Sequence, residues 1–305
     1  MQKNEFRSGF VTIIGRPNVG KSTFLNKVVG KKVAIMSDKP QTTRNKILGV
    51  VNAPNYQIAF TDTPGIHKAE SELDRRMVNA SYGSVSGVDA VIFMTTPTKK
   101  ILPGDEIILN NLRKTKIPVF LVINKVDQLK KFNSIDLTLA LYKDLYEFQG
   151  YFPISVLEDI NVNHLLDAIY DILPPGPKFY PDGMISDHDN KFLISEIVRE
   201  KVLYLTKEEI PHSIAVTVEL MKDNDDDKDV KDIYVAIYVE RDSQKKIIIG
   251  KNGALIKHIK DLAKSEIKKL LGQRINLELW VKVKKDWKDR PNDLASLGYS
   301  SDKFE

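Results

Sequence analysis

The stretch Gly15-Arg16-Pro17-Asn18-Val19-Gly20-Lys21-Ser22 matches the phosphate-loop pattern G-x-x-x-x-G-K-S and points to an α/β fold in the first half of the chain. It lies between a strand predicted at residues 10–14 and a helix predicted to begin near Ser22. The glycines let backbone amides turn toward phosphates, Lys21 supplies a charge to the β- and γ-phosphates, and the Ser22 hydroxyl ligates Mg²⁺. A glycine-rich turn with a chance lysine is the alternative. Because the motif and its context agree, the sequence favours a nucleoside-triphosphate site.

Apolar strands alternate with longer helical stretches around this loop. Short buried strands are predicted at residues 10–14, 57–61, 90–95, 119–123 and 151–154. This alternation is typical of a mostly parallel sheet with helices on both faces. The proline-rich run 173–177 cannot continue a helix or a central strand, so the first domain is predicted to end there. The predicted boundaries are 1–175 for the nucleotide domain, 176–190 for a linker, 191–285 for a second domain and 286–305 for a C-terminal tail.

Two further motifs favour GTP over other nucleotides. Asp62-Thr63-Pro64-Gly65-Ile66 follows the strand at 57–61, so Asp62 can hold Mg²⁺ through water while the Gly65 amide meets the γ-phosphate. Asn124-Lys125-Val126-Asp127 follows the strand at 119–123, and the Asp127 carboxylate can accept two hydrogen bonds from guanine. Adenine offers no matching donor pair, so the wrong base would leave buried groups unpaired. A phosphate loop, D-x-x-G and N-K-x-D in this order are together a highly specific signal for a GTP site.

These motifs, with Gln41-Thr42-Thr43-Arg44, resemble those of the Era family of bacterial GTPases. The resemblance implies that residues 41–44 form the first switch loop, with Thr43 favoured over Thr42 to complete the Mg²⁺ shell begun by Ser22. It adds Ser155 and Val156 to the guanine site, although the usual Ser-Ala-Lys reads Ser155-Val156-Leu157 here, which leaves contact with the base edge to backbone amides. Asn18 resembles the asparagine that holds K⁺ beside the phosphates in related GTPases, so K⁺ is a second predicted cation.

The position after D-x-x-G bears on the rate of hydrolysis. Many GTPases place a glutamine there to orient the attacking water, whereas this chain has Ile66. The family resemblance therefore implies slow intrinsic hydrolysis by positioning and electrostatics. One alternative is an RNA-binding protein that senses nucleotide with negligible turnover. Another is a P-loop enzyme that phosphorylates a metabolite. Such an enzyme has no use for the N-K-x-D motif or for an RNA-binding domain, which is predicted below for the second half of the chain.

The second half changes to a different order of elements. One helix is predicted at 191–205, two strands at 212–221 and 232–240, a helix at 254–271 and a last strand at 274–283. Ile214, Val216, Val218 and Leu220 alternate with period two, which predicts one buried face for the first of these strands. The acidic stretch 223–232 is predicted to be an exposed hairpin loop. Trp280 is predicted to lie in the core, whereas Trp287 could lie in the core or stack on a base.

A G-x-x-G loop is the candidate RNA site of this half. A lone G-x-x-G is weak, because a helix C-cap explains it equally well. The preceding isoleucines and the local charge strengthen it, since residues 244–285 hold twelve Lys and Arg against three Asp and Glu. In KH domains such a loop approaches the backbone of single-stranded nucleic acid closely. The candidate RNA-binding residues are Ile249, Gly250, Lys251, Asn252, Gly253 and Lys257.

The order helix, two strands, two helices, strand is similar to the bacterial, type II form of the KH fold, which is the C-terminal half of Era proteins. The resemblance implies binding of GTP and GDP, of the 3′ end of 16S rRNA and of the 30S subunit, whose assembly the protein would assist. It also implies some peripheral contact with the cell membrane, and we expect a monomer. No apolar run approaches about 18 residues, so a cytoplasmic protein is predicted. The absence of cysteine excludes disulfides and thiolate chemistry.

Overall fold

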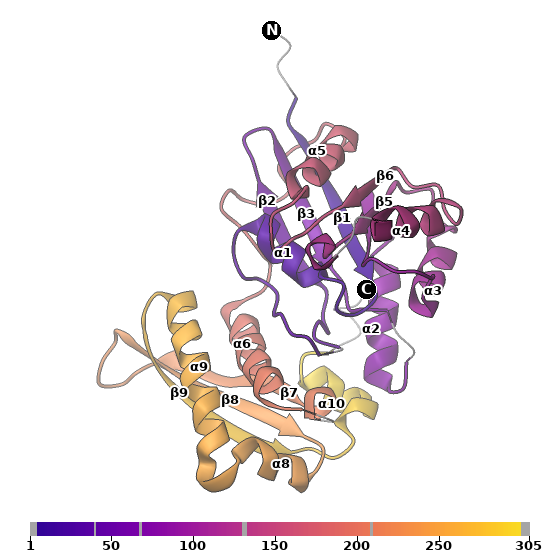
Figure 1. Cartoon of the computed structure of the whole chain (residues 1–305). Helices are drawn as coiled ribbons and strands as arrows, with labels where there is room; N and C mark the ends of the chain where they lie inside the picture. The colour runs from indigo at the N-terminus through magenta and orange to yellow at the C-terminus, as the bar shows by residue number, and fades with distance from the viewer. Residues whose placement is uncertain (1–4, 40, 67–68, 130–132, 208–209, 300–305) are drawn as a thin grey trace.

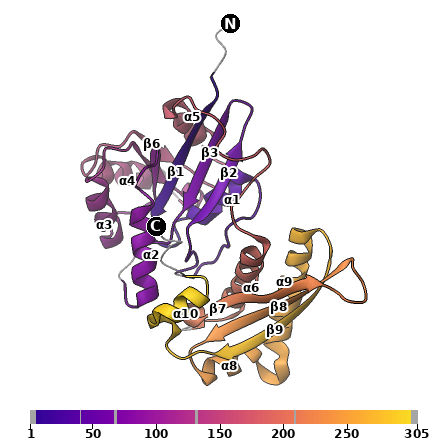
Figure 2. The ribbon, with the colours of Figure 1, turned by 180° about the vertical axis from the view of Figure 1, so that it is seen from behind.

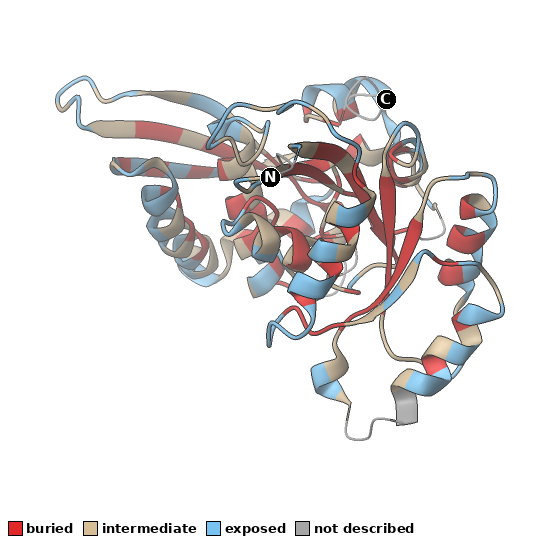
Figure 3. Cartoon of the chain, turned by 90° about the horizontal axis from the view of Figure 1, so that it is seen from above, coloured by how far each residue is buried: buried red, intermediate tan, exposed pale blue. Residues whose placement is uncertain are grey.

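The computed structural model describes residues 5–39, 41–66, 69–129, 133–207 and 210–299. Figure 1 shows two bodies, one around a six-stranded sheet and one around a three-stranded sheet, with the chain passing from the first to the second before α6. Buried residues concentrate in the strands of both sheets and on the faces of the helices that lie against them (Figure 3). Among the described residues, no helix combines the length and the apolar composition that a membrane span requires.

The first sheet has the strand order β2-β3-β1-β4-β5-β6. Its strands are β1 Arg7–Gly15, β2 Ile47–Asn52, β3 Tyr56–Asp62, β4 Ala90–Thr95, β5 Val119–Ile123 and β6 Gly150–Pro153. All neighbouring pairs are parallel except β2 and β3, which are antiparallel. The predicted mostly parallel sheet is confirmed, and β2 is an edge strand that the sequence analysis did not predict.

Helices cover both faces of this sheet, as predicted. They are α1 Lys21–Val29, α2 Glu72–Gly83, α3 Pro103–Leu112, α4 Asn133–Lys143 and α5 Val162–Ile172, with a short 3₁₀ turn η1 Val126–Gln128 after β5. Residues of α1 and α5 pack against the strand side chains on one face of the sheet, and residues of α3 and α4 pack against those on the other face. Because β1, β3, β4 and β5 run in the same direction, the loops that follow them meet at one edge of the sheet.

The second body has the element order predicted for a type II KH domain. Its elements are α6 Asn190–Leu205, α7 Ile210–Ser213, β7 Ala215–Asp223, β8 Val230–Val239, α8 Asp242–Ile249, η2 Lys251–Gly253, α9 Ala254–Leu271 and β9 Arg274–Val283. The strands are ordered β7-β8-β9, with β7 antiparallel and β9 parallel to β8. Helices α6 and α9 share an apolar core with the inner face of this sheet. In the reverse view the strands lie in front of these helices (Figure 2).

Two predictions about side chains on this sheet were wrong. A bulge between Val218 and Leu220 shifts the register of β7, so Leu220 is exposed instead of continuing the buried face. Trp280 is 46% exposed and lies beside Tyr234 on the outer face of the sheet, with the two rings tilted, and is not in the core. The alternation along β9 accounts for this, because Leu279 and Val281 take the inward positions on either side of Trp280.

The residues after β9 pack against the first body. Trp287 begins the 3₁₀ turn η3 Trp287–Asp289 and is fully buried, and the short helix α10 Pro291–Ser296 follows. Trp287, Leu294, Leu297 and Tyr299 form a cluster with Leu73, Met77 and Ala80 of α2. This segment therefore links the two bodies. The predicted domain boundaries at 175, 190 and 285 stay predictions, and residues 300–305 of the predicted tail lie outside the described residues.

Candidate functional site

The phosphate loop turns sharply between β1 and α1. Gly20 has φ 107°, and a Cβ atom there would lie 2.1 Å from Asn124 Nδ2, so the position needs glycine. Lys21 is buried, and its Nζ donates to the carbonyls of Gly15 at 3.0 Å and Arg16 at 3.1 Å. Burial lowers the pKa of Lys21 to about 8, although the nearby Asp62 acts in the opposite direction. An ammonium held among carbonyls at a helix N-terminus is suited to bind an anion.

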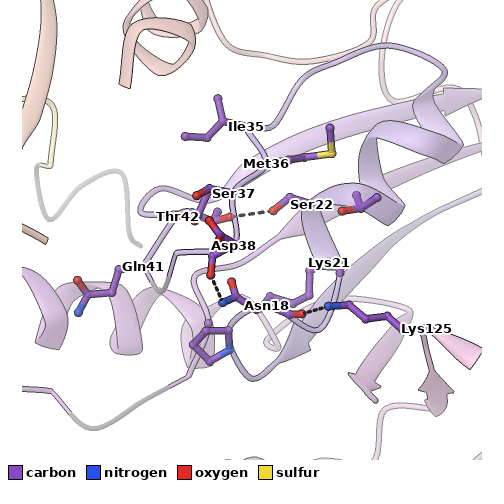
Figure 4. Close-up of a pocket in the computed structure, with 15 residues that line it drawn as sticks. Asn18, Lys21, Ser22, Ile35, Met36, Ser37, Asp38, Gln41, Thr42 and Lys125 are labelled. Atoms are coloured by element: carbon purple, nitrogen blue, oxygen red, sulfur yellow. Dashed lines mark hydrogen bonds between the residues drawn. The ribbon is translucent and has the colours of Figure 1, made fainter. Parts of the chain in front are cut away.

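A pocket of about 570 Å³ opens beside this loop. Figure 4 shows Lys21 and Ser22 on one side and the segment from Ile35 to Asp38 on the other, with Lys125 at the rim. Asn18 joins the two sides, because its Nδ2 donates to the Asp38 carbonyl at 2.7 Å and its own carbonyl accepts from Lys125 Nζ at 2.8 Å. Most of the predicted phosphate-loop and switch residues thus line one cavity with a residue of the N-K-x-D motif, whereas Gly15, Arg16, Val19 and Arg44 do not line it.

Three oxygen-bearing side chains meet at the base of the pocket. Ser22 Oγ lies 2.5 Å from Asp62 Oδ2 and 2.8 Å from Thr43 Oγ1. Asp62 is fully buried, its Oδ1 has no hydrogen-bond partner among the residues that the structure describes, and burial raises the pKa of its carboxyl. Hydroxyl and carboxylate oxygens are the ligands that Mg²⁺ prefers, so this cluster fits that ion. Thr42 is turned away, with its Oγ1 on the Lys39 carbonyl at 2.6 Å, so the geometry favours Thr43 as the ligand.

The N-K-x-D motif is braced from two sides. Asn124 Nδ2 donates to the Val19 carbonyl at 2.9 Å, and its Oδ1 accepts from the Val156 amide at 3.2 Å. Asp127 is exposed at the open end of the site, and its Oδ1 accepts from the buried Ser155 hydroxyl at 2.5 Å. The structure therefore brings together the five residues predicted to bind guanine, with one Asp127 oxygen fixed by Ser155.

Other predicted phosphate-site residues have distinct surroundings. The side chain of Arg16 points away from the phosphate loop to Asp105 of α3. Only the backbone of Arg16 contacts the rest of the loop, where its carbonyl accepts from Lys21. Gly65 lies against Pro17, where a Cβ atom would be 2.7 Å from the proline ring, and the Thr63 hydroxyl is buried on the Ile13 carbonyl. Ile66 is buried in the core beside α3. It therefore offers no polar group for orienting water, as the sequence indicates.

The first switch loop is held by the second body through contacts that the sequence did not reveal. Arg44 is buried and donates to the carbonyls of Ile214 at 2.5 Å and Pro211 at 3.0 Å. Arg199 of α6, also buried, donates to the Thr42 carbonyl. His212 Nδ1 lies 3.1 Å from Gln41 Oε1. The predicted switch residues 41–44 thus contact both the oxygen cluster and the second body.

The G-x-x-G loop forms a separate exposed site at the junction of α8 and α9. Gly250, Asn252 and Gly253 have positive φ values of 74°, 51° and 76°, which turn the chain sharply. Lys251, Asn252 and Lys257 are exposed, whereas Ile249 is half-buried and packs against the core. All six predicted RNA-binding residues therefore lie at the end of α8, in this loop or in the first turn of α9. An exposed basic loop with glycines suits close approach to a phosphate backbone.

Known proteins are similar to this chain over nearly its whole length. The family model described as a 50S ribosome-binding GTPase matches residues 10–125, and the KH domain model matches residues 209–288. The GTPase Era of Staphylococcus epidermidis is 49% identical over 298 residues and that of Staphylococcus haemolyticus is 50% identical over 299, each match covering 98% of this chain and 99% of the relative.

Two solved structures share the arrangement of both bodies. A variant of Aquifex aeolicus Era bound to GDP and AlF₄⁻ is 40% identical, with a TM-score of 0.92 over 97% of this chain and 100% of that chain. Era in complex with MgGDPNP and nucleotides 1506–1542 of 16S ribosomal RNA is 41% identical, with a TM-score of 0.93 over 97% of this chain and 99% of that chain.

Proposed function

Because this chain belongs to the Era family of GTPases, we propose that it couples GTP hydrolysis to binding of the 3′ end of 16S rRNA during assembly of the 30S subunit. The family predicted from the sequence is confirmed, and with it the enzyme class. The related structure with MgGDPNP and 16S rRNA nucleotides supports the choice of nucleotide and of RNA. Peripheral membrane contact and a monomeric state stay predictions from the family resemblance.

One observation carries the proposed coupling. Within the first switch loop, Thr43 contacts the oxygen cluster of the nucleotide site, and the next residue, Arg44, is bonded to the KH domain. Because Arg44 anchors this segment in the KH domain, a movement of Thr43 on binding of nucleotide and Mg²⁺ would be transmitted to that domain. Since coupling between two ligands is reciprocal, RNA must change the affinity for GTP by the same factor.

The roles of individual residues form part of the proposal. Ser22 and Thr43 would ligate Mg²⁺ directly, Asp62 would act through water, and the ion would neutralise charge on the transferring phosphoryl group. Asn124, Lys125, Asp127, Ser155 and Val156 would hold guanine. Asn18 would carry K⁺, and turnover in K⁺ buffer that exceeds turnover in Na⁺ buffer would support that role.

The first test compares turnover of GTP and ATP with Mg²⁺ in K⁺ buffer, with and without a short single-stranded RNA that matches the 16S rRNA 3′ end. We expect GTP-selective hydrolysis that this RNA accelerates, because residues 41–44 contact both the nucleotide site and the KH domain. A scrambled RNA of equal length and charge is the control. Turnover that the matching RNA leaves unchanged would contradict the coupling, and acceleration by both RNAs would contradict sequence-specific recognition.

A substitution in the G-x-x-G loop tests the RNA site separately. We expect Gly253→Asp to weaken RNA binding by about tenfold, since a carboxylate would face the phosphate backbone. The position has φ 76° and open space, a conformation that Asp and Asn tolerate. Gly253→Asn supplies the uncharged control, and Gly272→Asp adds the same charge at the other end of α9, where φ is 67°. Fluorescence anisotropy should show weaker binding for Gly253→Asp than for either control, and equal affinities would refute the assignment.

A further inference from the structure

A buried polar cluster lies beside the phosphate loop, outside the residues that line the nucleotide pocket. At its centre is Asp105 of α3, which is fully buried. Its Oδ2 accepts from Arg16 Nε at 2.9 Å and from the Tyr142 hydroxyl at 2.7 Å. Thr95, the last residue of β4, completes the cluster, with its Oγ1 3.1 Å from the Tyr142 hydroxyl. The four residues come from the phosphate loop, β4, α3 and α4.

Stability alone is a weak reason for this arrangement. Removing a carboxylate and a guanidinium from water is costly, and apolar residues of similar volume often serve a core as well or better. The ion pair between Arg16 and Asp105 does, however, fix the direction of the Arg16 side chain within the phosphate loop. The N-terminus of α3 is shaped to admit it, since a Cβ atom on Gly104 would lie 2.9 Å from Arg16 Cγ. The contact therefore constrains a loop whose backbone must meet phosphate.

Two backbone contacts connect the cluster with groups of the nucleotide site. The Arg16 carbonyl accepts from Lys21 Nζ, so the position of Arg16 bears on the phosphate-loop ammonium. The Thr95 carbonyl accepts from the Asn124 amide at 2.9 Å, and Asn124 in turn braces the loop at Val19. Asp105 therefore constrains the phosphate loop through Arg16, and the cluster constrains the N-K-x-D motif through Thr95.

We propose that Asp105 is a positioning residue of the GTP site, which acts through Arg16 to hold the phosphate loop in its binding geometry. Tyr142 and Thr95 keep the carboxylate oriented toward Arg16. Asp105 itself touches no nucleotide. Because the ground state and the transition state both use the phosphate loop, loss of the anchor raises the KM for GTP and weakens GDP binding, while kcat at saturation changes far less.

The decisive experiment is a double-mutant cycle on the full-length chain with Asp105→Asn and Arg16→Gln. Dissociation constants for fluorescent GDP and GTP analogues and the separate values of kcat and KM are measured for the four proteins. We expect Asp105→Asn alone to weaken both nucleotides by about tenfold or more, since small displacements of binding groups have large effects. In the Arg16→Gln background the same substitution changes affinity by less than about twofold, because its direct route to the loop through Arg16 is gone.

A control separates this role from a loss of packing. Thr12→Val removes a buried hydrogen bond from β1 to the Ser84 carbonyl and lowers the temperature of unfolding without touching the phosphate loop. It leaves the nucleotide affinities at their wild-type values. Nucleotide affinity that is unchanged in folded Asp105→Asn, or reduced equally in both Arg16 backgrounds, overturns the proposal, as does an equal loss in Thr12→Val.

A milder variant keeps the proposal testable where Asp105→Asn does not fold. Tyr142→Phe removes one of the two hydrogen bonds to the carboxylate and leaves the ring in place among Phe93 and its neighbours. It gives a smaller loss of GDP and GTP affinity that disappears in the Arg16→Gln background. Full affinity in Tyr142→Phe, or a loss in Tyr142→Phe that adds in full to the loss in Arg16→Gln, would overturn the proposal.

Discussion

Replacement of Arg44 by methionine is expected to release the first switch loop from the KH domain and to abolish most of the stimulation of GTP hydrolysis by RNA. Arg44 is buried, its guanidinium makes two hydrogen bonds to KH-domain carbonyls, and it lies 5.9 Å from the Trp287 ring. Hydrogen bonds from a charged group contribute about 1.5–3 kcal/mol each, so the contact amounts to several kcal/mol. Methionine keeps the apolar stem and removes these bonds.

Two measurements distinguish loss of the coupling between the domains from loss of the nucleotide site or the RNA site. Affinity for RNA without nucleotide should change little in Arg44→Met, because the G-x-x-G loop joins α8 and α9, whereas Arg44 contacts Pro211 of α7 and Ile214. The ratio of RNA affinities with and without GTP should fall toward one. Arg274→Met is the matched control, since Arg274 is an exposed arginine of the same domain that pairs with Asp227. Undiminished RNA stimulation in Arg44→Met would show that the coupling runs elsewhere.

The nucleotide site was predictable from the sequence because its geometry is local. Each motif follows a strand that is buried on both faces, such as β1 or β5, and such strands are marked by continuous apolar runs. The parallel order of β1, β3, β4 and β5 then brings the motifs to one edge without further information. The edge strand β2 was missed because it returns antiparallel to β3, outside the alternation of strand and helix on which the prediction rested.

The connection between the domains could not be read from the sequence. Arg44 meets Ile214 and Tyr299, which are 170 and 255 residues away in the chain. No local pattern distinguishes an arginine that will be buried by a second domain from one that faces solvent. Trp287 became buried for the same reason, since its partners in α2 precede it by more than two hundred residues. The exposure of Trp280, by contrast, could have been predicted from the sequence, because inward apolar residues alternate with outward residues along β9.

The largest effect is expected at the base site, where Asp127→Asn should convert the selectivity of the enzyme. The carboxylate of Asp127 would accept hydrogen bonds from guanine under the proposed assignment, whereas an asparagine amide would present a donor to the donor group on the base. A site built on such pairs rejects a mismatched base strongly, so kcat/KM for GTP should fall on the order of 10³-fold or more. Xanthosine triphosphate, which carries an acceptor at that position, should become the better substrate.

The comparison of three triphosphates separates altered selectivity from general damage. Asp127→Asn should lose activity with GTP, gain it with xanthosine triphosphate and remain inactive with ATP, whereas a damaged site would be inactive with all three. Asp171→Asn, an exposed aspartate on α5, is the control for the change in charge. Ser155→Ala should lower kcat/KM for GTP less and leave its preference intact, because it removes the bonds of the Ser155 hydroxyl to Asp127 and to the Glu158 amide but keeps the Asp127 carboxylate. Loss of GTP activity without any gain for xanthosine triphosphate would argue that Asp127 supports the loop and does not read the base.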